Sequence, residues 1–264
     1  VPAKELFGRA TSGAPMQARS FGFYSRGCLA GGTALPVNGE TWQVMRLSRN
    51  RMWGHPDMIA FLERFARRVP QVSRWPGILV GDISQPRGGP MLTGHASHQI
   101  GLDADIWLTP MPRRQLTAQE REMTSAVNVV RADRRDIDPR TWTSDHLSVI
   151  RAAAEDPQVE RVLVNAAIKK ALCREATGDR RWLSKVRPVP GHNYHKHIRM
   201  SCPAASPGCR PQDPPPSAEG CGSDLDWWFT PQVLNPRPNP NWRPPPPITM
   251  AGLPDACRQV LVAR

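Results

Sequence analysis

Most of the 7 histidines in this chain lie in two short segments that also carry other polar residues. The first segment, residues 94–105, contains two histidines and two aspartates, and the second, residues 192–197, contains three histidines. Imidazole and carboxylate are the ligands that zinc prefers when one coordination position stays open for water. We therefore expect the two segments to meet around one Zn²⁺ ion, with His98, Asp105 and a histidine of the second segment as ligands. Water on such an ion has a pKa of about 7.

The second segment leads into a predicted strand over residues 195–200. Alternate residues of a strand point to the same side, so His195, His197 and Arg199 share one face. Spacing does not distinguish the two histidines, because one can bind the metal while the other stands one strand pleat away, where a general base would act. His192, just before the strand, is a candidate for the same catalytic work. Arg199 is the arginine best placed to bind a substrate carboxylate.

The stretch DADIWL at the end of the first segment also alternates, which predicts a strand with Asp103 and Asp105 on one face. Asp103 is expected to hold a ligand histidine in one tautomer, as carboxylates beside metal sites commonly do. His95 would either form a hydrogen bond to a metal ligand or bind a further metal ion. His55 and His146 lie at or in predicted helices, and we expect both to be structural.

The elements that must position these residues are short. Residues 56–70 repeat apolar side chains at helical spacing between two prolines, which predicts an amphipathic helix. Residues 41–47, 77–83 and 159–165 are typical of strands, and residues 166–175 of a helix. Strands and helices that do not alternate strictly indicate an α+β fold. We expect a small antiparallel sheet that carries the zinc site, flanked by helices and by long Pro-rich loops.

The composition changes after residue 200. The chain contains Pro 29 and Gly 20, and prolines concentrate in the last quarter, with runs at 214–216 and 244–247. Such segments favour extended polyproline conformations and do not build a core. We expect residues 1–200 to form a single catalytic domain and residues 201–264 to be a Pro-rich extension of that domain, tied back to it by disulfides.

The 6 cysteines form no CxxC motif, so disulfides explain them better than metal binding does. Three disulfides imply an oxidising compartment, although six cysteines allow 15 pairings. No apolar run is long enough to predict a membrane span. The chain starts at Val1 with no apolar leader, which is typical of a mature secreted chain whose signal peptide has been removed.

The formal net charge is +12 at pH 7, and a strongly basic protein attracts polyanions. Nucleic acid, acidic cell-wall polymers and lipid phosphates all fit this charge. The chain has no zinc-finger spacing and no glycine-and-aromatic RNA-binding signature. A nucleic-acid binder would also leave the histidine segments and the cysteines unexplained. We therefore expect no nucleic-acid partner and no insertion into a membrane.

Several stretches carry a resemblance to a known family. They are GGP…GHASHQIGLDADIWL at residues 88–108, LVNAAIKK at 163–170, KVRP at 185–188 and HNYHKHIRMSCP at 192–203. Together they resemble the penicillin-insensitive murein endopeptidases, which belong to the lysostaphin / D-alanyl-D-alanine metallopeptidase / hedgehog superfamily. The resemblance extends from about Cys28 to Cys257, which is nearly the whole chain.

The resemblance implies a role for each matching residue. The zinc ligands would be His98, Asp105 and His197, with His195 as the candidate general base and His192 as a further catalytic histidine. His95 and Asp133 match further metal positions of the family, although the histidine that accompanies the second position is replaced here by Asp136. The implied disulfides are Cys28–Cys257, Cys173–Cys221 and Cys202–Cys209.

The activity that the resemblance implies is zinc-dependent hydrolysis of peptide cross-links in peptidoglycan, in the periplasm. The family cuts the D-alanyl–meso-diaminopimelate bond, and some members also cut diaminopimelate–diaminopimelate bonds. No serine nucleophile takes part, which would explain the insensitivity to penicillin. The main alternative is a zinc-holding cell-wall-binding module without turnover, although both His192 and His195 are present for catalysis. Monomer and homodimer, and the division of labour between these two histidines, remain open.

Overall fold

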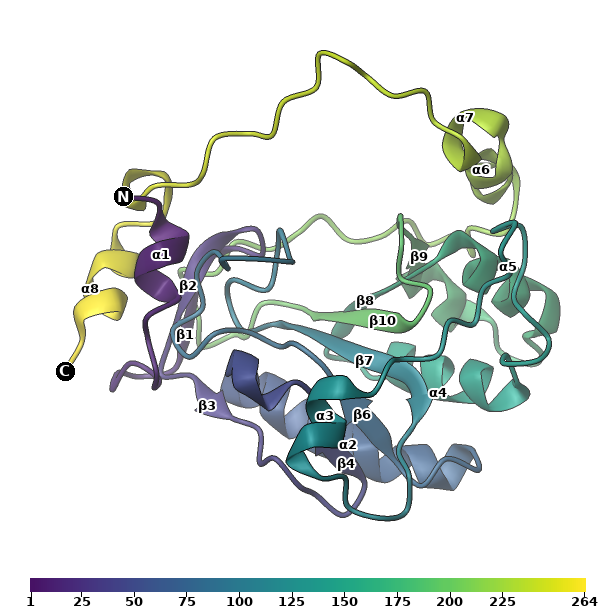
Figure 1. Ribbon diagram of the computed structural model, residues 1–264, viewed down its shortest axis with the longest axis horizontal. Helices are drawn as coiled ribbons and strands as arrows, with labels where there is room; N and C mark the ends of the chain where they lie inside the picture. The colour runs from purple at the N-terminus through teal and green to yellow at the C-terminus, as the bar shows by residue number, and fades with distance from the viewer.

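A six-stranded sheet forms the centre of the protein, and the histidine and aspartate segments lead into its two middle strands (Figure 1). The structure, a computed structural model, describes residues 1–264. The strands follow the order β4 (Trp42–Val44), β6 (Ile78–Val80), β7 (Asp103–Pro110), β10 (His195–Met200), β8 (Val159–Val164) and β9 (Val186–Pro188). The predicted α+β fold is confirmed.

The sheet is antiparallel around the site and parallel at both edges. β6, β7, β10 and β8 pair antiparallel, as predicted. β4 pairs parallel with β6, and β8 pairs parallel with β9, and these two edge pairings add to the small antiparallel sheet that was expected. The chain between the two strands of each edge pair is long enough for the crossover that parallel neighbours need. A helix supplies each crossover, α2 (Pro56–Val72) between β4 and β6 and α5 (Ala166–Glu175) between β8 and β9.

The register of β7 and β10 places the two histidine segments side by side. His197 lies opposite Asp105, and Arg199 lies opposite Asp103. Directly opposed residues of an antiparallel pair have Cβ atoms about 4.5–5.5 Å apart, and every second residue shares a face. Polar side chains that are far apart in the sequence therefore gather on one face of the sheet.

Helices α2 and α4 (Ser144–Ala154) lie on the opposite face, where they close the main core. Lys196 points away from the site, and its Nζ is 5.9 Å from the ring centroid of Phe65 on α2. α2 begins at Pro56 as predicted but continues to Val72, because Pro70 lies in its last turn and breaks the hydrogen-bond ladder only there. His55 caps this helix, since its Nδ1 accepts a hydrogen bond from the Asp57 amide, as expected of a structural histidine.

The remaining elements of the body are short. They are α1 (Ala3–Phe7), the hairpin of β1 (Arg19–Phe23) and β2 (Arg26–Ala30), the pair β3 (Thr33–Ala34) and β5 (Trp53–Gly54), η1 (Leu47–Arg49), α3 (Ala118–Met123) and η2 (Arg181–Lys185). None of the helices combines the length and the apolar composition that a bilayer crossing requires.

The extension contains more regular structure than its composition predicts. It forms α6 (Ser223–Asp226), η3 (Trp227–Phe229), α7 (Pro231–Leu234), η4 (Met250–Gly252) and α8 (Ala256–Val262). Between α7 and η4 the chain makes a long arch that stands away from the body in Figure 1. The disulfides are those that the resemblance implies, Cys28–Cys257, Cys173–Cys221 and Cys202–Cys209.

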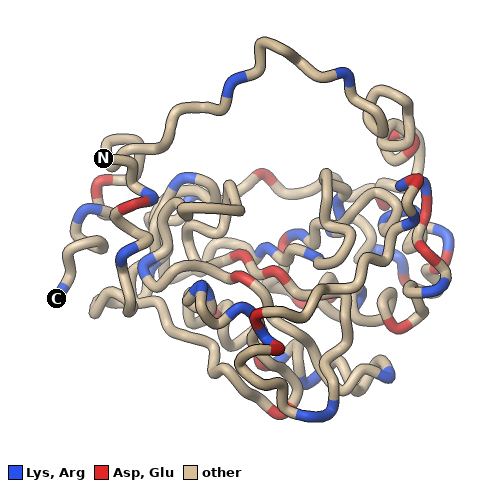
Figure 2. Tube along the Cα trace, in the orientation of Figure 1, with Lys and Arg blue, Asp and Glu red and all other residues tan.

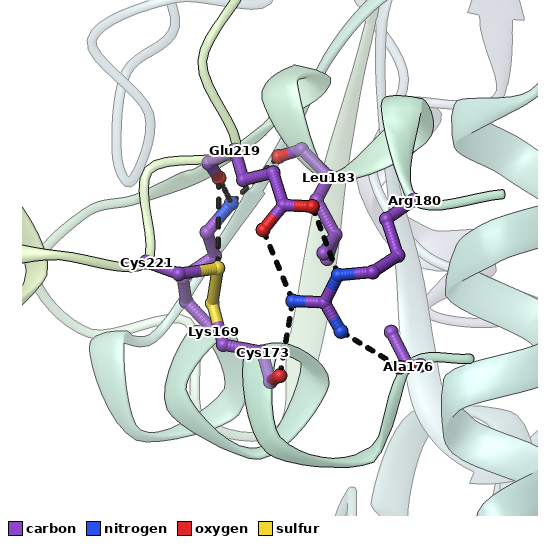
Figure 3. The surroundings of a disulfide bond; sticks show 7 residues. All are labelled: Lys169, Cys173, Ala176, Arg180, Leu183, Glu219 and Cys221. Atoms are coloured by element: carbon purple, nitrogen blue, oxygen red, sulfur yellow. Dashed lines mark hydrogen bonds and ion pairs between the residues drawn. A yellow bond between two sulfur atoms is a disulfide. The ribbon is translucent and has the colours of Figure 1, made fainter. Parts of the chain in front are cut away.

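Polar contacts around Cys173–Cys221 join the extension to α5 and η2 (Figure 3). The buried Lys169 amine donates hydrogen bonds to the carbonyls of Leu183 at 2.6 Å and Glu219 at 2.5 Å. Burial lowers the pKa of Lys169 to about 7. Arg180 Nε pairs with the Glu219 carboxylate at 2.8 Å. We propose from these contacts that the extension and the body form one domain.

Removal of this disulfide tests the proposal. We expect a Cys173→Ser/Cys221→Ser variant to lose about 2–4 kcal/mol of unfolding free energy, because the bond restricts a long loop of the unfolded chain. Its cysteines are 48 residues apart, against 7 for Cys202–Cys209, whose removal is the matched control and should cost less. Urea denaturation measures both. Two separate transitions in the wild-type protein, one for each part, would argue against a single domain.

Candidate metal centre and active site

His98 is presented by the loop between β6 and β7 and is completely buried. Its backbone takes a left-handed conformation (φ 63°), and its amide donates to Asp103 Oδ2 at 3.2 Å. Its Nδ1–H donates to the Ile83 carbonyl at 2.7 Å. This hydrogen bond assigns one proton to Nδ1 and leaves Nε2 as the nitrogen that faces Asp105. Nε2 is buried and has no hydrogen-bond partner.

Asp105, on β7, provides the second buried atom without a partner. Its Oδ1 forms no hydrogen bond and lies 3.4 Å from His98 Nε2. Burial alone would raise the pKa of the Asp105 carboxyl, but His98 and the neighbouring histidines hold it well below its usual range. Burial alone would likewise lower the pKa of His98, yet Asp105 raises it to about 9. Without a metal, a proton on His98 Nε2 therefore faces the Asp105 carboxylate, and a metal ion bound by both atoms would replace that proton.

These two atoms fit a metal ion. Two donors about 2.0–2.1 Å from a tetrahedral ion lie about 3.4 Å from each other, which is the separation of His98 Nε2 and Asp105 Oδ1. Donor atoms of His95, His98 and Asp105 all lie within 4.8 Å of one another. A nitrogen–nitrogen–oxygen set of this kind suits zinc and other divalent transition metals. The group could hold a metal ion.

His197 and His95 both border this pair, but in different ways. His197 Nδ1 makes no hydrogen bond and lies 3.8 Å from Asp105 Oδ1, and its ring centroid is 4.6 Å from that of His98. His95 Nε2 lies 3.5 Å from Asp105 Oδ2 but also donates to Asp82 Oδ2 at 2.9 Å. His95 therefore joins the tightest group of donors in the structure, whereas His197 offers the nitrogen that has no other partner.

Asp103 orients the histidines, as predicted. Its Oδ1 accepts a hydrogen bond from His197 Nε2 at 2.8 Å, which leaves Nδ1 of that ring facing Asp105. Arg199 Nε donates to the same oxygen at 2.7 Å. The Arg199 guanidinium lies over the Tyr24 ring at 4.2 Å and is almost fully buried, so it cannot reach a substrate. The expectation that Arg199 binds a substrate carboxylate is therefore wrong, because the carboxylate that it binds belongs to Asp103.

Loss of this guanidinium should destabilise the fold. Burial alone would raise the pKa of Asp103, but Arg199 and His197 hold it well below its usual range. We expect Arg199→Met to lower the unfolding free energy at about pH 7 by about 3–5 kcal/mol, because a buried carboxylate loses its partner. The exposed pair Arg64–Asp156 supplies the control, and Arg64→Met should cost less than about 1 kcal/mol.

The pH dependence of this effect has a definite sign. The ion pair stabilises the fold above the unfolded-state pKa of an aspartate, about 3.9, and its contribution is lost as the pH falls through the lower folded-state value. The difference between wild type and Arg199→Met should therefore narrow below about pH 4. Urea denaturation across this range measures it. A difference that stays constant with pH would contradict the electrostatic origin.

His195 and His192 stand at the open side of the cluster. His195 Nε2 lies 3.6 Å from Asp105 Oδ2. Burial lowers the pKa of His195 to about 4 against the pull of Asp105, so the ring is neutral at neutral pH. The His192 ring centroid is 4.9 Å from that of His195, and its Nδ1–H donates to the Pro190 carbonyl at 2.8 Å. Both predicted catalytic histidines therefore lie beside the candidate metal ligands.

Asp133 does not join the group of donors. It lies in an exposed turn, where its carboxylate pairs with Arg131 and accepts a hydrogen bond from the Arg135 amide at 3.0 Å. Asp136 pairs with Arg174 at 2.9 Å. His146, expected to be structural, is buried, and its Nε2–H donates to the Leu108 carbonyl at 2.9 Å. The outer metal position that the resemblance suggests at Asp133 is thus occupied by arginine contacts.

Asp82 is a residue of the site that the sequence analysis missed. It lies two residues after β6, it is buried, and it binds His95 as well as Arg49 at 3.2 Å and Arg51 at 3.1 Å. An aspartate in the first residues after a buried strand is the signal that could have identified it. Its role is to position His95 beside Asp105.

A cleft of about 350 Å³ opens beside the cluster. Asp105, His95 and His195 form one part of its wall, and Asp82, Gly81, Arg46, Arg49, Trp107, Ser125, Ala126 and Tyr194 form the rest. A substrate in this cleft would reach the candidate metal ligands and the neutral His195 together.

Sequence comparison places this chain among named proteins. A family profile described as penicillin-insensitive murein endopeptidase matches residues 20–262. A protein of that name from Haemophilus influenzae is 44% identical over 245 residues, which cover 93% of this chain and 83% of that protein. Proteins of the same name from Klebsiella pneumoniae and Escherichia coli are 41% and 40% identical over 244 and 251 residues, covering 92% and 95% of this chain and 86% and 89% of theirs.

Proposed function

This chain belongs to the penicillin-insensitive murein endopeptidase family, and on that basis we propose that it hydrolyses peptide cross-links of peptidoglycan with the help of a bound zinc ion. The observation that carries the proposal is the pair of buried atoms without hydrogen-bond partners, His98 Nε2 and Asp105 Oδ1, beside a neutral His195 at the wall of a cleft. Buried polar atoms are rarely left unpaired unless a further group binds them.

We assign the zinc ligands to His98 Nε2, Asp105 and His197 Nδ1. Asp103 supports this set, because its hydrogen bond turns Nδ1 of His197 toward Asp105. His95 is assigned a supporting position, because its Nε2 is shared with Asp82. A zinc ion bound there would activate water and polarise the scissile carbonyl.

His195 is the residue that moves the proton. Its neutral ring can take a proton from the attacking water at Nε2 and deliver it to the nitrogen of the leaving amine. His192 lies beside His195, and its Nδ1–H is directed at Pro190; from this position it would support the negative charge that develops on the substrate. Asp105 brings metal binding and proton transfer close together, because it is a proposed zinc ligand and its carboxylate lies 3.6 Å from His195 Nε2.

The proposed bond is the D-alanyl–meso-diaminopimelate amide, with the diaminopimelate–diaminopimelate amide as a second substrate. Peptidoglycan is rich in carboxylates, and the net charge of +12 would steer the enzyme toward it. Figure 2 shows basic positions spread along the whole trace, which suits long-range attraction better than recognition at one spot. Three disulfides and this substrate support a location in the periplasm.

Digestion of cross-linked muropeptides, followed by mass spectrometry, tests the proposal. Cleaved monomers are expected from the wild-type protein. The alternative, a cell-wall-binding module, predicts that dimeric muropeptides are retained by the protein and recovered uncut. The position of His195 beside Asp105 favours the enzyme, because a binding module has no use for a neutral base at that point.

A further inference from the structure

The cleft beside the candidate metal ligands contains an arginine without an acidic partner. Arg46 and Arg49 both line this cleft. Arg49 pairs with Asp82 at 3.2 Å, whereas Arg46 forms no ion pair. Glu122, on α3, uses its carboxylate to accept hydrogen bonds from the Ser48 amide and hydroxyl, both at 2.8 Å. The positive charge of Arg46 is therefore left for a group that enters the cleft.

The Arg46 guanidinium is held rigidly. Its two terminal nitrogens donate to the carbonyl of Arg121 at 2.7 Å and of Thr124 at 2.8 Å, and the group lies 5.1 Å from the Trp107 ring centroid. The residue itself has a left-handed backbone (φ 56°), which is uncommon outside glycine and persists where the surroundings determine it. A guanidinium has more N–H donors than two carbonyls use. The remaining donors can bind a ligand at little cost in entropy.

Arg46 is also placed next to the reacting groups. Trp107, which it covers, lies opposite His195 in the register of β7 and β10. Trp107, His195 and Asp105 line the same cleft as Arg46. A peptide that contacts the candidate base at one point can therefore contact the guanidinium at another.

We propose that Arg46 binds a carboxylate of the substrate that lies next to the scissile amide, and so selects for peptides in which this carboxylate is free. The inference rests on the proposed function. In a D-alanyl–meso-diaminopimelate cross-link, the carbon bonded to the scissile nitrogen carries a free carboxylate. Guanidinium and carboxylate match through two parallel hydrogen bonds, which fix the orientation of the amide as well as its identity. Arg46 thus takes the role that the sequence suggested for Arg199.

Two peptides and three variants test this assignment. The peptides are a cross-linked muropeptide dimer with the carboxylate free and the same dimer with that group converted to a carboxamide. We expect amidation to lower kcat/KM of the wild-type enzyme by about 10- to 100-fold, the worth of a charge-assisted contact. Arg46→Gln should lower kcat/KM on the carboxylate peptide by a similar factor and change it less than about threefold on the carboxamide. Arg46→Lys keeps the positive charge but lacks the paired donors of a guanidinium, so its kcat/KM on the carboxylate peptide should lie between those of the wild type and Arg46→Gln.

Arg67→Gln is the matched control, since it removes the same charge from an exposed position of α2 and should leave both peptides unaffected. A purely structural role of Arg46 would lower cleavage of both peptides equally and would overturn the inference. Equal cleavage of the two peptides by the wild-type enzyme would overturn it as well, without any variant, and would leave the proposed function intact. Failure to cleave either peptide would refute the proposed function, and the inference with it.

Discussion

Replacing His98 with asparagine is expected to abolish binding of the proposed zinc ion and to lower kcat/KM for muropeptide cleavage by about 10³- to 10⁴-fold. Metal-assisted polarisation contributes several kcal/mol to the transition state, and each 1.36 kcal/mol is a factor of ten. Asparagine is the informative substitution, because it tolerates the left-handed backbone at φ 63° better than alanine does. A loss of activity then reports the missing imidazole rather than a strained loop.

The measurement combines zinc content per chain with the rate of cleavage. His55→Asn is the matched control, because His55 caps α2 and asparagine is itself a good N-cap. That variant should keep both zinc and activity. Chelation of the wild-type enzyme should reproduce the His98→Asn result, and zinc should restore only the wild type. Cleavage that persists after complete removal of zinc would refute a metal-dependent hydrolase.

His195→Ala is expected to keep the zinc and lose about 10²- to 10⁴-fold in kcat, the usual contribution of a general base. His195 Nε2 lies 3.6 Å from Asp105 Oδ2, so His195 is close to the proposed zinc ligands. It is not itself one of the three proposed ligands. Zinc content and kcat are measured on the same preparation. His192→Ala provides the comparison, and a smaller loss there would assign the proton transfer to His195.

A different result would reassign the residue. If His195→Ala released the zinc with an affinity loss as large as that of His98→Asn, then His195 would be a ligand and His192 the remaining base. If both histidine variants kept their activity, neither His195 nor His192 would be the general base, and the proposed mechanism would be contradicted.

Local patterns in the sequence predicted much of the site. The alternation in β7 and β10 placed Asp103, Asp105 and His197 on the correct faces, because the side-chain period of a strand is independent of its partners. The N-terminus of α2 was likewise readable from Pro56. The disulfide pairings came from family resemblance, since cysteine spacing leaves them undetermined.

The parts that could not be predicted depend on contacts between distant segments. Arg199 was expected to face the substrate because its strand face was known, but the carboxylate opposite it in the register satisfies its charge. Asp82 became part of the site only when the loop after β6 met His95. Arg46 gained its position from carbonyls of a segment more than seventy residues away. No periodicity within a single segment carries such information.

The three disulfides are nested, with Cys202–Cys209 inside Cys173–Cys221 and both inside Cys28–Cys257. During synthesis Cys28 emerges first and its partner last, and oxidation in order of appearance would join Cys28 to Cys173 instead. The native pairing would then be reached by thiol–disulfide exchange, in which a free thiolate attacks the non-native disulfide and forms a mixed disulfide as the intermediate. Maturation of this enzyme should therefore depend on a disulfide isomerase as well as an oxidant.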